Sequence, residues 1–538
     1  MSGFTGTGQL FRLALRRDRI VASAWILGLF VYAYSQAASI IALYPTQADL
    51  DRLARTAEGV GANPAVVAIQ GPAYEAHTYG GATAWQLVTP WVFLIGLMSL
   101  MLMTRHTRQE EETGRAELVS AAVVGRYAWM AAALLYVLAV NLVLAAITTA
   151  TFIAIGLPAA GSVWLVVDCA LGGLVFAGIA AITVQVTEFA RPANGMAFAA
   201  LGAAFLLRAI GDTSTELSWL SWLSPIGWAE RFQPFAGERW WVLLLPVALL
   251  AVLLVAASAL LVRRDVGAGA LPTRLGPAEA PPWLGSPLAL AWRLQRGTLL
   301  GWIIGVAIAG LSFGAIAQDM VQAATEDPET AKMLATLGGS GSITDIYLAA
   351  VLSWLGMLAA GYAVQATLRL HSEETELRAE QVLATAVSRI RWAGSHLLVV
   401  AGGSAVVLAT GGLVAGLAHG LRAGDLGGEL PRILGGALVQ LPAVWVMAAV
   451  GAALFGLLPR LVVGITWAVL AVVLFVTMFG QPLRLSRWLL DLSPFAHLPK
   501  LPAAAFTATP LTWLLATAAV LAAAGLAGLR RRDLASTA

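Results

Sequence analysis

The chain has little charge and almost no cysteine. Only 12% of its 538 residues are charged, whereas 59% are hydrophobic, a far more apolar composition than soluble globular proteins have. The single cysteine, Cys169, lies in an apolar run, so neither a disulfide framework nor a cysteine-based metal site can form within the chain. These features predict an integral membrane protein.

The sequence also has no motif for binding ATP and no metal-ligand spacing. The phosphate-loop pattern G-x-x-x-x-G-K-[ST] does not occur, and neither of the two lysines, Lys332 and Lys500, lies in a glycine-rich context. The six histidines are scattered, without His-x-x-x-His spacing. We therefore predict that the chain binds no cofactor and no metal ion, and that it is not itself an enzyme.

What the sequence does contain is a series of long apolar segments. A membrane-spanning helix needs about 20 mostly apolar residues, and twelve segments approach or exceed that length. The net charge of +3 comes mainly from arginines between these segments; the positive-inside rule explains them without a nucleic-acid partner. The expected spans are residues 20–43, 85–104, 127–156, 161–187, 195–212, 238–262, 298–319, 344–367, 394–418, 431–457, 461–480 and 511–529.

The chain repeats itself. The segment EEETGRAELVSAAVVGR (residues 110–126) aligns without gaps to EETELRAEQVLATAVSR (residues 373–389), and nine of the seventeen positions are identical. Two other landmarks recur in the same order, Leu-Ser-Pro at 223–225 and 492–494 and Arg-Arg-Asp at 263–265 and 531–533. Because internal repeats of this kind indicate duplicated architecture, we interpret the chain as a tandem duplication.

The fold class predicted is an all-α integral membrane protein with 12 transmembrane helices in two six-helix repeats. An even number of spans brings each half back to the side on which it started, so the repeats are parallel. The first half is expected at 1–265, a cytoplasmic linker rich in Gly and Pro at 266–290, and the second half at 291–538. The distribution of arginines favours cytoplasmic N- and C-termini.

The repeated segment is the candidate site for a partner protein. Its acids and arginines gather at one end and small apolar residues at the other, and the pairs Glu111 with Arg115 and Glu374 with Arg378 have the i,i+4 spacing that supports a helix. The alternative is an ordinary charged loop, but the positive-inside rule requires neither consecutive glutamates nor the same pattern twice. The candidate docking residues are Glu110, Glu111, Glu112, Arg115, Glu117, Arg126, Glu373, Glu374, Arg378, Glu380 and Arg389.

These residues carry a resemblance to a known family. The segment at 110–126 resembles the coupling-helix region of ABC-2-type permeases, and the duplicated layout is similar to the actinobacterial polyketide-antibiotic (tetronasin-type) and multidrug exporter permeases. The resemblance implies a type V exporter-like fold and coupling helices at 110–126 and 373–389. It also implies two copies of a nucleotide-binding ATPase that hold ATP and Mg and dock at these helices. The second copy departs from the first where Leu377 replaces Gly114, which questions whether both copies make the same contacts.

Polar and aromatic residues inside the spans are candidates for the substrate pathway. Asp168 is the clearest, because an acid in the hydrocarbon region is costly and needs a reason; Arg208 is its possible mate, and a hydrogen-bonded acid facing the bundle interior is the alternative. Asn141 can equally be an interhelical hydrogen-bonding group, and tryptophans commonly anchor helices at the lipid interface. The candidates are Asp168, Asn141, Trp91, Trp302 and Trp354.

Together these observations favour the permease subunit of an ATP-driven exporter in the bacterial cytoplasmic (inner) membrane. The resemblance implies hydrophobic or amphiphilic substrates such as antibiotics and other drugs, and an exporter of lipid or another hydrophobic metabolite fits the residues equally well. An ion-coupled secondary transporter is the alternative of a different class, but Asp168 is nearly alone as an intramembrane ionisable group. The expected partners are the ATPase, membrane lipid and the hydrophobic substrate.

Overall fold

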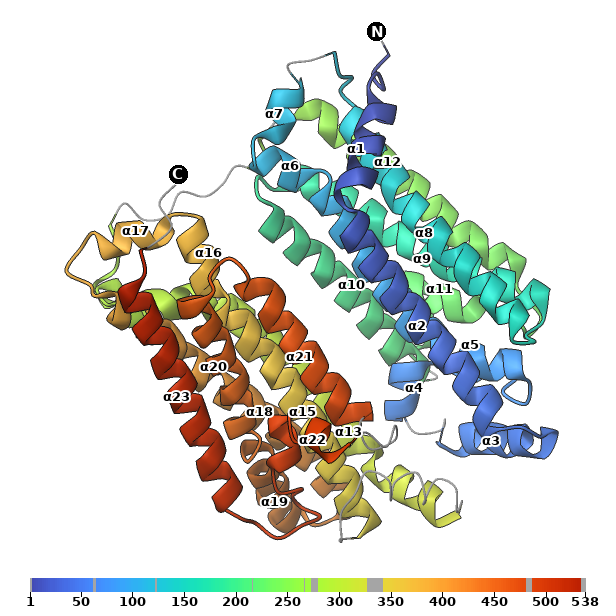
Figure 1. The fold of residues 1–538 in the computed structure, drawn as a ribbon. Helices are drawn as coiled ribbons and strands as arrows, with labels where there is room; N and C mark the ends of the chain where they lie inside the picture. The colour runs from blue at the N-terminus through green and yellow to red at the C-terminus, as the bar shows by residue number, and fades with distance from the viewer. Residues whose placement is uncertain are drawn as a thin grey trace. The chain divides into compact units, whose positions relative to one another are not determined.

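The computed structural model describes residues 2–60, 64–120, 123–214, 216–265, 267–271, 279–326, 342–479 and 486–533. All regular structure in these ranges is helical. The chain forms two compact units, Met1–Gly276 and Pro277–Ala538 (Figure 1). Their boundary falls inside the linker expected at 266–290, of which residues 266 and 272–278 lie outside the described ranges.

Eleven helices in the described part of the chain are long and apolar enough to cross a membrane. In the first unit they are α2 (Arg19–Leu43), α5 (Tyr79–Arg105), α8 (Ala128–Ala154), α9 (Ala159–Val186), α10 (Ala190–Thr213) and α12 (Leu244–Arg263). In the second unit they are α13 (Pro287–Glu326), α15 (Ile343–Thr367), α18 (Arg389–Ala423), α19 (Leu426–Leu438) continued by α20 (Leu441–Leu457), and α23 (Thr509–Arg531).

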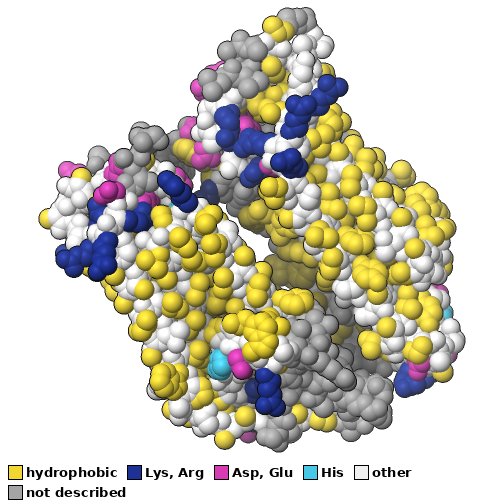
Figure 2. All heavy atoms as spheres, viewed as in Figure 1, with side chains coloured by type: hydrophobic (Ala, Val, Ile, Leu, Met, Phe, Trp, Pro, Cys, Tyr) yellow, Lys and Arg dark blue, Asp and Glu magenta, His cyan; other side chains and the backbone are white. Residues whose placement is uncertain are grey.

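The twelfth expected span, at 461–480, coincides with α21 (Val462–Phe479), which is apolar but shorter than the other eleven. An all-helical, multi-pass membrane protein is thereby confirmed, while the number twelve and the parallel arrangement of the repeats stay predictions. Apolar side chains cover the flanks of the helices, as Figure 2 shows. On α12, for example, Val252 and Val255 are 64% and 71% exposed. Exposed apolar stripes of this length fit a lipid-facing surface.

Small residues let the central helices of the first unit approach closely. On α9, a Cβ atom added at Gly173 would lie 2.3 Å from a methyl carbon of Ile95 on α5, and one added at Gly172 would lie 2.9 Å from Val92. Lipid tails provide no hydrophobic drive for helix association, so close van der Waals packing of this kind holds membrane helices together. The pair α5 and α9 therefore forms the core of the first unit.

Glycine also permits close helix packing in the second unit, where α20 and α23 cross. A Cβ atom on Gly456 of α20 would lie 1.9 Å from the carbonyl oxygen of Gly525 on α23, so only glycine permits this crossing. The core of the unit is formed around α15, whose residues Leu352, Leu355 and Tyr362 are fully buried.

The helix ends follow local capping chemistry. The Thr78 side chain accepts a hydrogen bond from the Gly81 N–H at the start of α5, and Ser388 accepts one from the Arg391 N–H at the start of α18. Such caps satisfy backbone donors that have no partner within the helix.

Short helices also lie between the spans. The segment 44–84 contains the helices α3 (Gln47–Val60) and α4 (Pro64–Gln70). Arg12, Arg16 and Arg17 lie on a separate helix, α1 (Thr7–Arg17), which ends before Asp18, and Arg19 begins α2. Short helices precede the last span of each unit. They are η1 (Ser218–Leu223) and α11 (Pro225–Phe232) in the first unit, and α22 (Arg487–Leu490) and η4 (Pro494–His497) in the second.

Candidate docking site at the repeated glutamate segments

The first repeated segment is not the single helix expected over 110–126. It forms α6 (Arg108–Glu112) and α7 (Arg115–Ser120), separated by a turn in which Gly114 has a φ of 71°. Residues 121 and 122 lie outside the described ranges. The predicted i,i+4 pair of Glu111 with Arg115 is therefore wrong, because the turn redirects Arg115, whose Nε lies 3.1 Å from Oε2 of Glu110 instead.

The second segment repeats this arrangement despite its different turn residue. It forms α16 (Arg369–Thr375) and α17 (Arg378–Leu383), and Leu377 takes the left-handed conformation with a φ of 59°. Arg378 bonds Glu373 with the same 3.1 Å from Nε to Oε2, and that hydrogen bond raises the pKa of Arg378. The expected pair of Glu374 with Arg378 is replaced in the same way. The change from glycine to leucine thus leaves the local contacts of the turn intact.

The left-handed conformation of Leu377 is expected to lower the stability of the protein, and a substitution tests this directly. A left-handed conformation costs a residue with a Cβ atom about 1–2 kcal/mol, whereas glycine adopts it freely. We expect Leu377→Gly to raise the midpoint of thermal unfolding of the purified protein. Leu377→Ala is the control, since it removes the half-exposed side chain but keeps the Cβ atom. An equal gain from alanine would show that the backbone conformation is not the cause.

Each segment is tied to the end of the last long helix of its own unit by a two-pronged ion pair. Glu111 accepts hydrogen bonds from Nη2 and Nη1 of Arg264, just past α12, at 2.7 and 2.9 Å. Glu374 accepts hydrogen bonds from both terminal nitrogens of Arg532, just past α23, at 2.6 Å each. Bidentate pairs of arginine with carboxylate fix geometry as well as adding energy.

The last arginine of each segment donates hydrogen bonds to backbone carbonyls at the same helix end. Arg126 donates to the carbonyl oxygens of Val262 and Arg264 at 2.8 and 3.0 Å, and Arg389 donates to the carbonyl oxygen of Arg532 at 2.6 Å. These are the carbonyls that a helix leaves without partners at its C-terminus, where a cation is also favoured by the helix dipole. We call each set a clamp. The clamps consist of Glu111, Arg126 and Arg264 in the first unit and Glu374, Arg389 and Arg532 in the second.

The other glutamates divide into buried and exposed groups. Glu110 and Glu373 are each 4% exposed; Arg17 pairs with the first, and Arg369 lies 2.6 Å from the second. Glu112 is exposed but accepts a hydrogen bond from the first backbone N–H of α10 at 3.0 Å. The exposed carboxylates on α7 and α17 are Glu117 and Glu380. Of the candidate docking residues, these two are best placed to meet a partner.

The pathway candidates do not come together in one place. Asp168 is 2% exposed, and its Oδ2 has no hydrogen-bond partner in the described structure. Its expected mate, Arg208, pairs instead with Glu230 at 3.1 Å and donates to the backbone of α4. The expected pair is therefore wrong, because Glu230 lies closer to the guanidinium.

Three other candidates have internal partners. Asn141 donates to Ser99 Oγ at 3.1 Å, so it acts as an interhelical hydrogen-bonding group. Trp91 is fully buried and donates to the Leu29 carbonyl at 3.1 Å, and Trp302 donates to Gln365 at 2.7 Å. Trp354 differs, because it lines a cavity in the second unit.

The clamp arginines, Arg264 and Arg532, were not predicted as site residues. The signal was present, since both lie in the repeated Arg-Arg-Asp triplets. The buried network of Arg208, Asp212, Glu230 and Arg231 left no such signal, because Arg208 and the two acids have no charged counterpart in the second half.

Comparison with known proteins identifies a family that matches most of the chain. The family described as "Multidrug efflux system permease Rv1217c, C-terminal domain" matches residues 8–263 and 284–530, and each matched range lies within one of the two units. The chain is also similar to the multidrug efflux system permease protein Rv1217c of Mycobacterium tuberculosis (strain ATCC 25618 / H37Rv). The two are 43% identical over 533 residues, which cover 99% of this chain and 96% of the relative.

Proposed function

The chain belongs to the family of the multidrug efflux system permease Rv1217c, and we propose that it is the permease of an ATP-driven exporter. It moves hydrophobic or amphiphilic compounds outward across the bacterial cytoplasmic membrane, with both termini on the cytoplasmic side. ATP and Mg are bound by a separate nucleotide-binding ATPase. The observation that carries the proposal is the clamp, which occurs once in each unit with equivalent residues.

The clamps suggest how ATP hydrolysis reaches the membrane helices. An ATPase subunit that contacts α7 or α17 displaces a segment tied to the end of α12 or α23 by a two-pronged ion pair. Displacement of the segment therefore shifts the last helix of that unit. Each unit then responds to its own ATPase subunit, and rocking of the two units opens the pathway to alternate sides.

The duplicated site predicts the composition of the complex. One permease chain presents two equivalent docking segments, so we expect one permease and two ATPase subunits. Native mass spectrometry of the complex, purified through an affinity tag on the permease, measures this ratio. One ATPase per permease, or a permease that pairs with a second copy of itself around two ATPases, would contradict the proposal.

One observation favours a second candidate, an ion-coupled transporter. Asp168 is buried in α9, its Oδ2 has no hydrogen-bond partner among the described residues, and intramembrane acids commonly mark proton pathways. If transport is ATP-driven, Asp168→Asn should retain at least about half of the export rate, because the amide has the same shape and avoids the cost of a buried charge. Loss of export together with loss of its dependence on a pH gradient would favour the ion-coupled transporter. The measurement is efflux from cells with and without a proton uncoupler.

A further inference from the structure

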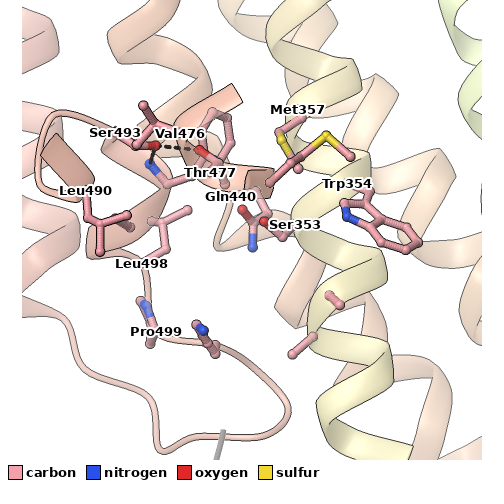
Figure 3. Close-up of a pocket in the computed structure, with 16 residues that line it drawn as sticks. Ser353, Trp354, Met357, Gln440, Val476, Thr477, Leu490, Ser493, Leu498 and Pro499 are labelled. Atoms are coloured by element: carbon pink, nitrogen blue, oxygen red, sulfur yellow. Dashed lines mark hydrogen bonds between the residues drawn. The ribbon is translucent and has the colours of Figure 1, made fainter. Parts of the chain in front are cut away.

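The second unit contains a cavity of about 180 Å³ between α15, α21 and the η4 segment (Figure 3). Trp354 and Met357 contribute to the α15 wall, and Thr477 and Ser493, joined by a 2.7 Å hydrogen bond, lie across from them. The described lining is mostly apolar, with five polar side chains among its sixteen residues. The apolar ones include Trp354, Met357, Val476, Phe495 and Leu498, and the polar ones are Ser353, Gln440, Thr477, Ser493 and Lys500.

Gln440 is the unusual member of this lining. It lies between α19 and α20, is 4% exposed, and its Oε1 has no hydrogen-bond partner in the described structure. α15 passes close by, since a Cβ atom on Gly356 would lie 2.9 Å from that oxygen. A buried acceptor without a donor is unfavourable, so the carboxamide is an open hydrogen-bonding group on the cavity wall. The hydroxyls of Thr477 and Ser493, by contrast, bond each other.

The corresponding place in the first unit is filled. Residues 208–231 align without gaps to 477–500 through the shared Leu-Ser-Pro, and Trp219 and Leu220 match Trp488 and Leu489. In this register Thr477 replaces Arg208 and Pro499 replaces Glu230. At this place in the first unit, Arg208 and Glu230 form an ion pair 3.1 Å long. Arg208 also donates hydrogen bonds to the Val67 and Ala68 carbonyls of α4 at 3.0 and 2.8 Å.

The two equivalent tryptophans show the same divergence. Trp91 and Trp354 correspond at the offset of 263 that relates the glutamate segments. Trp91 is fully buried and hydrogen-bonded to the backbone of α2. Trp354 is half-buried, contacts Phe313 edge to face with ring centres 5.3 Å apart, and lines the cavity. The duplication thus left a packed structural core in one unit and an open, amphipathic cavity in the other.

We propose that this cavity binds the polar end of a neutral or anionic amphiphile that carries a hydroxyl or amide N–H group. The donor of the ligand bonds Oε1 of Gln440, and its apolar part packs on Trp354 and Met357. The described lining includes no acid that could pair with a cationic head group, so cationic amphiphiles are disfavoured. The volume is below the 300–1,000 Å³ usual for drug-sized ligands, so one end of the molecule enters and the rest projects from the mouth.

Two sources could supply this chemistry, an exported compound or a membrane lipid. That the ligand is an exported compound rests on the proposed function, whereas the binding of an amphiphile in the cavity does not.

The test uses the full chain in nanodiscs without any ATPase. Ser353→Cys, in a Cys169→Ala background, places a thiol in the cavity, and its labelling by N-ethylmaleimide is followed with 1-decanol or decyl methyl ether as probe. We expect 1-decanol to slow labelling at least threefold. Decyl methyl ether, which lacks the donor, should need about a two- to tenfold higher concentration, as expected for one neutral hydrogen bond. Thr385→Cys on the exposed surface is the control and should be indifferent to both probes.

Gln440→Met removes the carboxamide at similar volume and should abolish the difference between the two probes. Absence of protection, or equal protection by both probes when Gln440 is present, would overturn the proposal. If protection is seen, adding the partner ATPase identifies the source. Stimulation of ATP hydrolysis by 1-decanol, lost in Gln440→Met, indicates an exported compound, and a copurifying lipid lost in Gln440→Met without such stimulation indicates a lipid site. Failure of the ATPase to bind would leave the labelling result standing.

Discussion

Replacing Glu374 with glutamine should uncouple the second unit from its ATPase while leaving the exposed docking surface unchanged. Glu374 and Arg532 keep only 4% and 16% of their side-chain surfaces exposed, and removing one partner of such a buried pair typically costs about 3–5 kcal/mol. Arg532 would then be left beside the ring of Phe455, 4.9 Å away, without its carboxylate. We expect ATP-dependent export to fall at least tenfold and the thermal midpoint to drop.

The control for this prediction is Glu380→Gln, which removes the same charge from an exposed position on α17 and should leave the thermal midpoint unchanged. A charge swap, Glu374→Arg with Arg532→Glu, should recover part of the lost stability, because the two side chains interact directly. Glu111→Gln should produce the same pattern in the first unit through Arg264. If the swap is no better than the sum of its single variants, the pair does not act as a clamp.

The second large effect is expected at the exposed carboxylates. Glu117→Lys combined with Glu380→Lys reverses one charge on each docking segment without touching a clamp. Like charges brought together across an interface cost several kcal/mol, so the amount of ATPase that copurifies with the permease should fall at least tenfold. Each single variant should retain one ATPase subunit per chain.

Glu216→Lys serves as the matched control for charge reversal. It is an exposed glutamate that follows α10, at the opposite end of that helix from Ala190 and the Glu112 contact, and should leave ATPase binding intact. Unchanged thermal midpoints in the double variant, the two single variants and the Glu216→Lys control would show that the loss arises at the interface. Full retention of both ATPase subunits in the double variant would place docking elsewhere.

Much of the fold could be predicted because the membrane imposes a simple rule. A span must be long, apolar and helical, and the predicted segments at 20–43 and 344–367 differ by one residue at their starts from α2 and α15. Elements outside the membrane obey no such rule. The helices α3 and α4 therefore went unpredicted, because neither is as long and apolar as a span.

The candidate site was found in sequence but its internal geometry was not. Repetition of the glutamates identified the segments, whereas spacing alone paired Glu111 with Arg115 as if the segment were one helix. The turn at Gly114, and the left-handed Leu377 in its place, cannot be recognised from i,i+4 spacing. Glu111 pairs with Arg108 three residues earlier and with Arg264, which is 153 residues away in sequence, and the second pairing depends on how the helices pack.

The most direct test of an ATP-driven permease is transport by defined components. The purified chain, reconstituted into inverted proteoliposomes with and without the partner ATPase, is supplied with a fluorescent amphiphile, and its accumulation in the lumen is measured. The expected result is uptake that requires both ATP and the ATPase and that is lost in the Glu117→Lys, Glu380→Lys double variant. Uptake by the permease alone, driven by a pH gradient and indifferent to ATP, would contradict it.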